Sequence, residues 1–360
     1  MPKRTTARLA DVARVAGVSL ATASRALSAP DLVQRQTQER VRHAATLLGY
    51  LPHGAARALA SRRSRTIGAV VPTVDNPIFA TATQALARAL SAASHTLLLA
   101  SHEYDPQAEV VVTRALLERG VDGLMLVGLD HTPKLFHTID QAGVPYELTW
   151  ALDPGGHHHC VGFSNRDASR RSVQHLLDLG HRDFAVLSGH TEHNDRARER
   201  LAGVRDALAA RHLPLPPERV LETSFALGSG RLGLRTLWQR AGCESFTALV
   251  CGNDLLALGA LLECAAQGVP IPQALSIVGF DDIELAAEFI PALTTVRVPS
   301  SEIGRRAAER LLARLGGKRE PRLCETPAEL IIRASTGSAP ARARATRAAR
   351  PRAIADEPVR

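Results

Sequence analysis

Before Arg65 the apolar positions recur with the spacing of short helices. They predict a first helix over 8–16, where the residues at i, i+3, i+4 and i+7 form one apolar face. Gly17 interrupts this pattern, and Ser19 is a favourable N-cap for a second helix over 20–27. A third helix is expected over about 37–48. The segment therefore predicts three helices without strands.

The residues after the third helix have the composition of a connector. Gly49 is a natural C-cap, and Pro52 prevents the helix from continuing. Residues 53–60 favour a helix but offer few apolar side chains to bury, and 61–65 form a polar linker. We therefore expect a small helical head over 1–52 and a hinge helix with its linker over 53–65.

From Thr66 onward the periodicity changes, and short apolar runs alternate with amphipathic stretches. Strands are predicted over 67–71, 97–100, 124–127, 146–150, 184–187, 248–251 and 276–280. Helices are predicted over 77–93, 106–119, 165–179, 196–211 and 254–267. This alternation indicates βαβ units and parallel sheets covered on both faces.

The number of strands predicts how the body is divided. About ten strands over roughly 270 residues exceed one comfortable open sheet, so we expect two lobes within 66–338. The lobe boundary is expected near 161–165, and the chain is expected to cross back near 291–298. Residues 339–360 are rich in Ala, Arg and Pro without periodicity, which indicates a disordered tail.

Composition excludes several classes of protein. Of the 360 residues, 45% are apolar and 22% are charged, which is typical of a globular chain. No apolar run is long enough to span a membrane, and the basic N-terminus lacks the apolar segment of a signal peptide. An odd number of cysteines without a CxxC pair argues against a disulfide framework and a four-thiolate zinc site; they are Cys160, Cys243, Cys251, Cys264 and Cys324. A cytoplasmic protein is expected.

The positive charge is concentrated at the two ends of the chain. Residues 1–65 contain twelve Lys and Arg against three acidic residues, a net charge of +9, and the last 22 residues carry +4. The segment between them, 66–338, is therefore −5. A basic head on a mildly acidic body predicts that the head binds a polyanion.

The head has the features of a helix-turn-helix. Two helices joined by a turn containing Gly17 suit DNA recognition, with the second helix in the major groove. That helix carries small hydroxyl side chains suited to phosphates, together with Arg25. A generic helical hairpin is the alternative that topology alone leaves open.

Particular motifs make the resemblance specific. LADVA at 9–13, AGVS at 16–19 and TASRAL at 22–27 resemble the DNA-binding head of the LacI/GalR family of bacterial transcription regulators. LGYLP at 48–52 and ARALA at 56–60 resemble that family's linker and hinge helix. The sequence departs from the family at Ala23, where Val is usual, and at Arg8, where Thr is common.

The resemblance implies DNA contacts at particular residues. Base reading falls on Leu20, Ala21 and Arg25; only Arg25 could give a bidentate contact to guanine, and the other two could offer apolar contact. Phosphate binding falls on Ser19 and Thr22. In the hinge, Arg57 is a further expected DNA contact, and Leu59 matches the leucine that the family's paired hinge helices insert into the minor groove.

The body resembles the two-lobed, periplasmic-binding-protein-like sensor domain of the same family. The matching segments are 68–79, 120–124, 179–182, 200–203, 253–260, 278–282 and 291–296. The effector-binding residues implied by these motifs are Asn76, Phe79, Arg200, Phe225, Asn253 and Asp281. They are expected near the carboxyl ends of strands, where open parallel sheets bind ligands. Each alone could equally be a capping or solvated residue, although Arg200 and Asp281 have no obvious structural partner.

The resemblance also suggests a class of effector. The segments 75–77, 131–133 and 161–165 look most like the gluconate-type branch of the family. A pocket that contains an arginine is compatible with a sugar acid and equally with a neutral sugar. We expect a repressor that acts as a homodimer, reads a palindromic operator in the nucleoid, and needs no cofactor, metal or membrane.

Three other motifs suggest different functions. Residues 228–233 satisfy GxGxxG after a possible strand at 220–223, which would suit an NAD(P)-dependent oxidoreductase; the alternative is a helix N-terminus whose small residues allow close packing. Residues 157–160 (HHHC) could suggest a metal site, but consecutive side chains diverge, so a surface loop is expected. Asp281 and Asp282 are adjacent, yet no nucleophile or acid/base partner is evident. We expect no enzyme activity.

Overall fold

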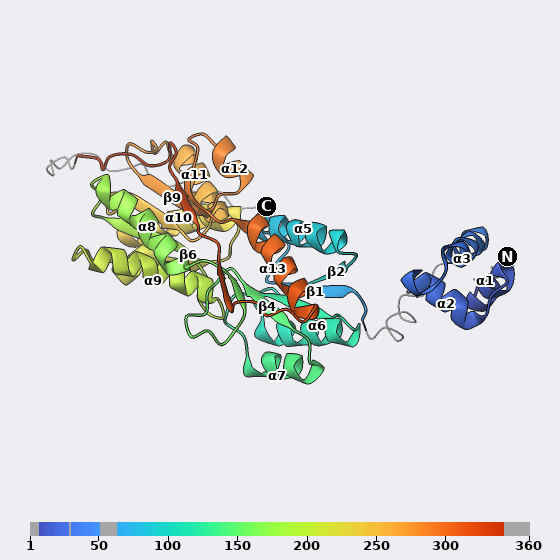
Figure 1. Ribbon diagram of the computed structural model, residues 1–360. Helices are drawn as coiled ribbons and strands as arrows, with labels where there is room; N and C mark the ends of the chain where they lie inside the picture. Colours follow the sequence, from blue (N-terminus) through green and yellow to red (C-terminus); the bar gives the residue numbers. More distant parts are fainter. Residues whose placement is uncertain (1–6, 29, 51–62, 342–360) are drawn as a thin grey trace.

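The computed structural model describes residues 7–28, 30–50 and 63–341 (Figure 1). The head consists of α1 (Leu9–Ala16), α2 (Leu20–Ser28), a 3-10 turn (Pro30–Leu32) and α3 (Arg35–Leu47). Ser19 caps α2 as expected, since its Oγ accepts a hydrogen bond of 3.1 Å from the backbone N–H of Thr22. The three predicted helices are confirmed, although α3 begins two residues earlier than expected.

The core of the head is small and tightly packed. Val12, Ala23 and Val41 are fully buried among the three helices. Ala23, the departure from the family's usual Val, therefore packs inside the core. Gly49 is not the C-cap itself: Leu48 caps α3, and Gly49 follows it in the left-handed conformation with φ +61°.

The first lobe is built on one parallel sheet with the strand order β11-β5-β4-β3-β1-β2. Its strands are β1 (Thr66–Val71), β2 (Thr96–Ser101), β3 (Gly123–Val127), β4 (Tyr146–Thr149), β5 (Cys160–Gly162) and β11 (Leu323–Glu325). Helices α5 (Pro77–Ala92) and α13 (Ser300–Leu315) lie side by side on one face (Figure 1). The other face is covered by α6 (Pro106–Glu118) and α7 (Pro133–Ala142).

The second lobe repeats this arrangement with the strand order β12-β10-β9-β8-β6-β7. Its strands are β6 (Phe184–Gly189), β7 (Val220–Thr223), β8 (Ala248–Cys251), β9 (Ser276–Asp281), β10 (Thr294–Arg297) and β12 (Glu329–Ile331), the last antiparallel to β10. Helices α8 (Asn165–Asp178) and α9 (Asp195–Ala209) cover one face, and α10 (Leu227–Ala241) and α11 (Asp254–Gln267) cover the other. The short helix α12 (Glu284–Glu288) and a 3-10 turn (Pro217–Arg219) complete this lobe.

The chain passes between the lobes three times, once more than the sequence pattern suggested. It leaves the first lobe after β5, returns after β10, and crosses again between β11 and β12. The third crossing was missed because β11 and β12 have three residues each and are largely exposed, so neither forms an apolar run. Three connections between the lobes allow them to close on one another while remaining tied together.

The ends of the body need one correction to the sequence-based boundaries. The backbone N–H of Ala339 donates to the carbonyl oxygen of Leu179 at 2.8 Å, so order extends past the expected start of the tail at 339. The rest of the tail, 342–360, lies outside the described residues. So do the hinge residues 53–62, including Arg57 and Leu59. Within the described ranges, no helix is long and apolar enough to cross a membrane.

Candidate functional site: a cleft between the lobes

A cavity of about 340 Å³, partly open to solvent, lies between the two lobes. The first lobe lines it with Asn76, Ile78, Phe79, Tyr104 and Trp150, and the second with Asn194, Arg196, Ala197, Arg200, Phe225, Asn253 and Asp281. All six residues expected to bind effector are therefore brought to one pocket. Several follow directly on the carboxyl ends of strands, where the helix N-termini of parallel sheets also point.

Two asparagines combine capping with a place in the pocket. Asn76 accepts a hydrogen bond from the backbone N–H of Ile78 at 3.2 Å, and Asn253 accepts one from Leu256 at 3.0 Å. Each therefore caps the helix that begins after it, as the simpler interpretation required. Capping uses the amide oxygen, and the buried Nδ2 of Asn253 has no hydrogen-bond partner among the described residues. That nitrogen remains able to donate to a ligand.

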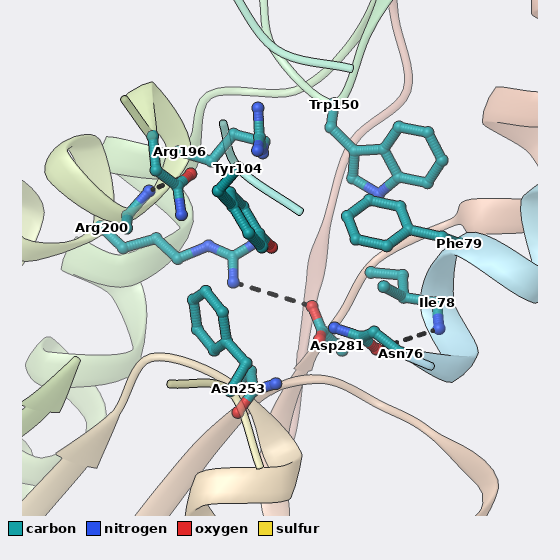
Figure 2. Close-up of a pocket in the computed structure, with 12 residues that line it drawn as sticks. Asn76, Ile78, Phe79, Tyr104, Trp150, Arg196, Arg200, Asn253 and Asp281 are labelled. Atoms are coloured by element: carbon teal, nitrogen blue, oxygen red, sulfur yellow. Dashed lines mark hydrogen bonds and ion pairs between the residues drawn. The ribbon is translucent and has the colours of Figure 1, made fainter. Parts of the chain in front are cut away.

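Arg200 and Asp281 face each other in this cleft, which corrects the expectation that neither has a structural partner. The Arg200 guanidinium lies 3.7 Å from Asp281 Oδ1, as Figure 2 shows. It also donates to the Gly252 carbonyl oxygen at 2.7 Å and to Asn165 Oδ1 at 2.9 Å, and its Cζ lies 3.7 Å from the centre of the Phe280 ring. These contacts fix the guanidinium in one orientation.

Burial changes the protonation of the carboxyl groups beneath the pocket. Desolvation raises the pKa of Asp281 to about 8, although the nearby Arg200 and Asn76 lower it in part. Burial likewise raises the pKa of Asp254 to about 6, in spite of hydrogen bonds from Thr295 and the backbone of Ile283. Asp281 is thus a buried carboxyl group that a ligand could stabilise in its charged form by donating a hydrogen bond.

Sequence reasoning missed several residues of the cleft. Trp150 is 1% exposed and packs edge-on against Phe79, with ring centres 5.2 Å apart (Figure 2). Tyr104 lies 6.2 Å from the ring of Phe225 on the opposite lobe. Neither sits in a motif that the resemblance singled out. The only signal was position, because both follow strands β2 and β4 closely.

The arginines near Arg200 are now separated by their surroundings. Arg196 also lines the cleft and donates to Asp195 at 2.9 Å. Arg198 instead pairs with Asp130 at 2.7 Å, and its side chain is about half exposed. The pocket therefore contains Arg196 beside Arg200 but not Arg198.

Three buried polar atoms of the cleft have no hydrogen-bond partner in the described part of the chain. They are the donors Trp150 Nε1 and Asn253 Nδ2 and the acceptor Asp281 Oδ1. Unpaired buried polar atoms are costly, and they are offset when a ligand supplies the missing partners. A ligand with several hydroxyl groups both donates and accepts, so it matches this set.

The second candidate site is the exposed face of α2 in the head. Leu20, Ala21 and Arg25 are exposed, and within the described chain no ion-pair partner is found for Arg25. Ser19 and Thr22 are already engaged, because their hydroxyl oxygens lie 2.8 Å apart. A phosphate contact by either hydroxyl would therefore add to this local bond or replace it.

The GxGxxG segment is explained by helix packing. It begins α10, and a Cβ at Gly230 would come within 2.3 Å of the Leu256 carbonyl oxygen on α11. A Cβ at Gly233 would meet Leu187 on β6 in the same way. Small residues are thus required for close contact between elements, which was the simpler interpretation.

The other two motifs also have structural roles. His158 stacks on Phe136 with ring centres 4.7 Å apart and lies 2.8 Å from the Tyr146 hydroxyl. Asp282 points away from the cleft and pairs with Arg297 and Arg333, each at 2.7 Å. Neither arrangement resembles a metal site or a pair of catalytic carboxylates.

Comparison with known proteins covers almost the whole chain. Residues 8–53 match the model for bacterial regulatory proteins of the lacI family, and residues 173–336 match a periplasmic binding protein-like domain. The chain is 36% identical to the HTH-type transcriptional regulator GntR of Pseudomonas aeruginosa, covering 88% of this chain and 92% of that protein. It is 32% identical to the HTH-type transcriptional repressor PurR of Vibrio parahaemolyticus, covering 91% and 98%.

Solved structures give the same picture. A complex of the transcriptional regulator CelR with cellobiose matches with a TM-score of 0.68 and 30% identity, covering 91% of this chain and 99% of that one. The Lac repressor dimer bound to operator and the anti-inducer ONPF matches with a TM-score of 0.80 and 26% identity, covering 92% and 100%. These relatives are regulators, and nothing among them supports the oxidoreductase alternative.

Proposed function

Because the chain belongs to the LacI family of bacterial regulatory proteins, and is thus a DNA-binding transcriptional regulator, we propose that a polyhydroxylated ligand between its lobes controls operator binding. The ligand is a sugar or a sugar acid. The observation that carries this proposal is the set of unpaired polar atoms in the cleft, two donors and one acceptor. Hydroxyl groups satisfy both kinds of atom, and an aromatic wall suits the apolar face of a sugar ring.

The relatives support a ligand of this class without fixing it. CelR is solved with cellobiose, a sugar, and the Lac repressor with an anti-inducer. Relatives named GntR and PurR match to similar extents, so the gluconate-type branch remains a prediction. Arg196 and Arg200 together could also neutralise the carboxylate of a sugar acid.

We propose that DNA recognition follows the arrangement of the Lac repressor, whose solved form is a dimer bound to operator. Residues 1–52 would bind one half-site of a palindromic operator, with Leu20, Ala21 and Arg25 at base edges and Ser19 and Thr22 at phosphates. Residues 53–65, including Arg57 and Leu59, would form the hinge in the minor groove. Residues 66–338 would sense the effector and hold the homodimer together in the cytoplasm.

A ligand screen tests the proposal. Purified protein is heated with sugars, sugar acids and nucleobases, since a ligand that binds the folded state raises the melting temperature. A compound that stabilises the parent is then titrated calorimetrically into Asp281→Asn and into the control Asp282→Asn. Asp282 is the matched control because it is adjacent in sequence but paired outside the cleft.

The proposal predicts that a sugar or sugar acid binds the parent and Asp282→Asn with similar affinity. Asp281→Asn should bind it at least about tenfold more weakly, because a charged hydrogen bond is lost. Stabilisation by a nucleobase alone would contradict the ligand class. Equal affinity for all three proteins would remove Asp281 from the site.

A further inference from the structure

The loop that follows β3 is held by the second lobe at the edge of the cleft. Asp195 Oδ2, on the first turn of α9, accepts a hydrogen bond of 3.1 Å from the backbone N–H of Leu129. Arg196, which also lines the cleft, donates to the Val127 carbonyl oxygen at 3.0 Å. We call the contact between 127–130 and the start of α9 the interlobe seam.

The seam depends on the conformation of the loop. Arg198 adds a third contact, to Asp130 at 2.7 Å. Gly128 adopts φ +93°, and a Cβ there would overlap the guanidinium of Arg196. A change in the path of 128–130 would therefore disturb all three contacts and the position of Arg196 in the cleft.

A buried pair of ionisable residues supports this loop from within the first lobe. The side chains of His131 and Glu109 are 1% and 3% exposed. His131 Nδ1 lies 3.0 and 3.1 Å from the two carboxyl oxygens of Glu109, and Nε2 lies 3.2 Å from the Gly128 carbonyl oxygen. The imidazole ring thus bridges α6 and the loop.

Hydrogen-bond chemistry fixes how many protons this pair holds. A carbonyl oxygen can only accept, so His131 Nε2 must carry a proton toward Gly128. The contact of Nδ1 with Glu109 then requires a second proton, located on the ring beside a carboxylate or on the carboxyl group itself. Without it, a nitrogen lone pair would face a buried carboxylate, which is strongly unfavourable.

The surrounding groups do not replace this proton. His102 lies 3.8 Å from Glu109, but burial lowers the pKa of His102, so it is neutral near pH 7. On the side of α7, His131 meets the edge of the Phe136 ring, and His158 lies behind that ring. From α9 the nearest charges are Arg196, Asp195 and Arg198, all of which are used in the seam.

We propose that the proton shared by His131 and Glu109 positions the loop at 128–130 for the interlobe seam, and so makes closure of the cleft dependent on pH. Loss of the proton on alkalinisation forces the ring away from Glu109 and releases the Gly128 carbonyl oxygen. The seam then loosens, and the closed arrangement becomes less populated. The inference builds on the effector cleft proposed above, but its test requires no effector.

Trp150 provides a direct measure of cleft closure. It is buried in the cleft, and Trp238 is the only other tryptophan of the chain. In a Trp238→Phe background, acrylamide quenching of fluorescence reports how accessible Trp150 is. We expect the quenching constant to rise by about twofold or more between about pH 6 and 9, in step with titration of the His131 ring followed by NMR on ¹⁵N-histidine-labelled protein.

Variants assign the transition to the pair. His131→Asn should give high quenching at every pH, because Asn cannot hold both contacts with the same proton. Glu109→Gln should shift the transition to lower pH, since the carboxylate that favours the ring proton is gone. His175→Asn is the control histidine, because His175 bonds Thr336 and has no contact with the seam. Asp281→Asn is the second control, because the pKa of Asp281 also lies near 8.

The expected result is a transition that persists in both controls, disappears in His131→Asn and moves in Glu109→Gln. A transition that disappears in Asp281→Asn and persists in His131→Asn would overturn the inference. Quenching in the parent that stays constant while the His131 ring titrates would overturn it as well, without relying on any variant. None of these outcomes depends on the identity of the effector.

Discussion

Arg200 and Asp281 lie opposite each other in the interlobe cleft at 3.7 Å, too far apart for a direct hydrogen bond. Both side chains are almost completely buried, and Asp281 Oδ1 has no hydrogen-bond partner among the residues described. A buried pair held slightly apart in this way can accept a ligand hydroxyl between its members. The pair therefore forms a preorganised recognition element, and its protonation should respond to binding.

Effector binding should release a proton near pH 7. In the free protein, burial raises the pKa of Asp281 to about 8, so the carboxyl group is largely protonated at pH 7. A hydroxyl that donates to Oδ1 favours the carboxylate and lowers this pKa. Affinity should therefore increase as pH rises toward 8 and level off above it. Calorimetry in two buffers with different ionisation enthalpies measures the proton release, and proton uptake would show that Asp281 donates instead.

Arg25→Ala should weaken binding to the operator by about 1–3 kcal/mol and relax preference at one base pair of each half-site. Nonspecific DNA binding should change much less. Arg14→Ala is the matched control, because Arg14 is a head arginine paired with Asp11 on α1. Fluorescence anisotropy with specific and scrambled duplexes decides the matter. Equal losses on both duplexes would make Arg25 a phosphate contact.

The two glycines at the start of α10 should respond oppositely to alanine. A Cβ at Gly228 meets nothing within 4 Å, so Gly228→Ala should leave stability unchanged or raise it by up to about 1 kcal/mol. Gly230→Ala should lower the melting temperature, because its Cβ would press on the backbone of α11. Similar melting temperatures for the two variants would contradict the packing explanation of this motif.

Local patterns predicted much of this molecule, and the failures have physical causes. Helix caps such as Ser19 and Asn253 could be read directly, because capping depends on residues within one turn. The strands β11 and β12 could not, because they are stabilised by pairing with distant strands rather than by their own apolar residues.

The candidate site divides in the same way. Motif residues such as Phe79 and Arg200 were found, whereas Trp150 was not, because only the fold brings it against Phe79. The contact of Glu109 with His131 joins residues 22 apart on different elements. No spacing in the sequence signals such a pair.

Salt should strongly weaken binding of the head to DNA. Residues 1–65 carry a net charge of +9, and cations that contact phosphates release condensed counterions. The logarithm of the binding constant should fall linearly with the logarithm of salt concentration. Anisotropy titrations at several salt concentrations measure the slope, and a slope near zero would show that the basic head does not lie on the phosphate backbone.

The most direct test of the account is operator binding measured with and without the stabilising sugar or sugar acid. A labelled operator duplex is titrated with the parent and with Asp281→Asn, and anisotropy gives the dissociation constants. The parent's affinity should change by about 5- to 150-fold when the ligand is added, a coupling of about 1–3 kcal/mol. Asp281→Asn should bind the operator like the unliganded parent and show no change with ligand. An operator affinity of the parent that is identical with and without bound ligand would contradict the account.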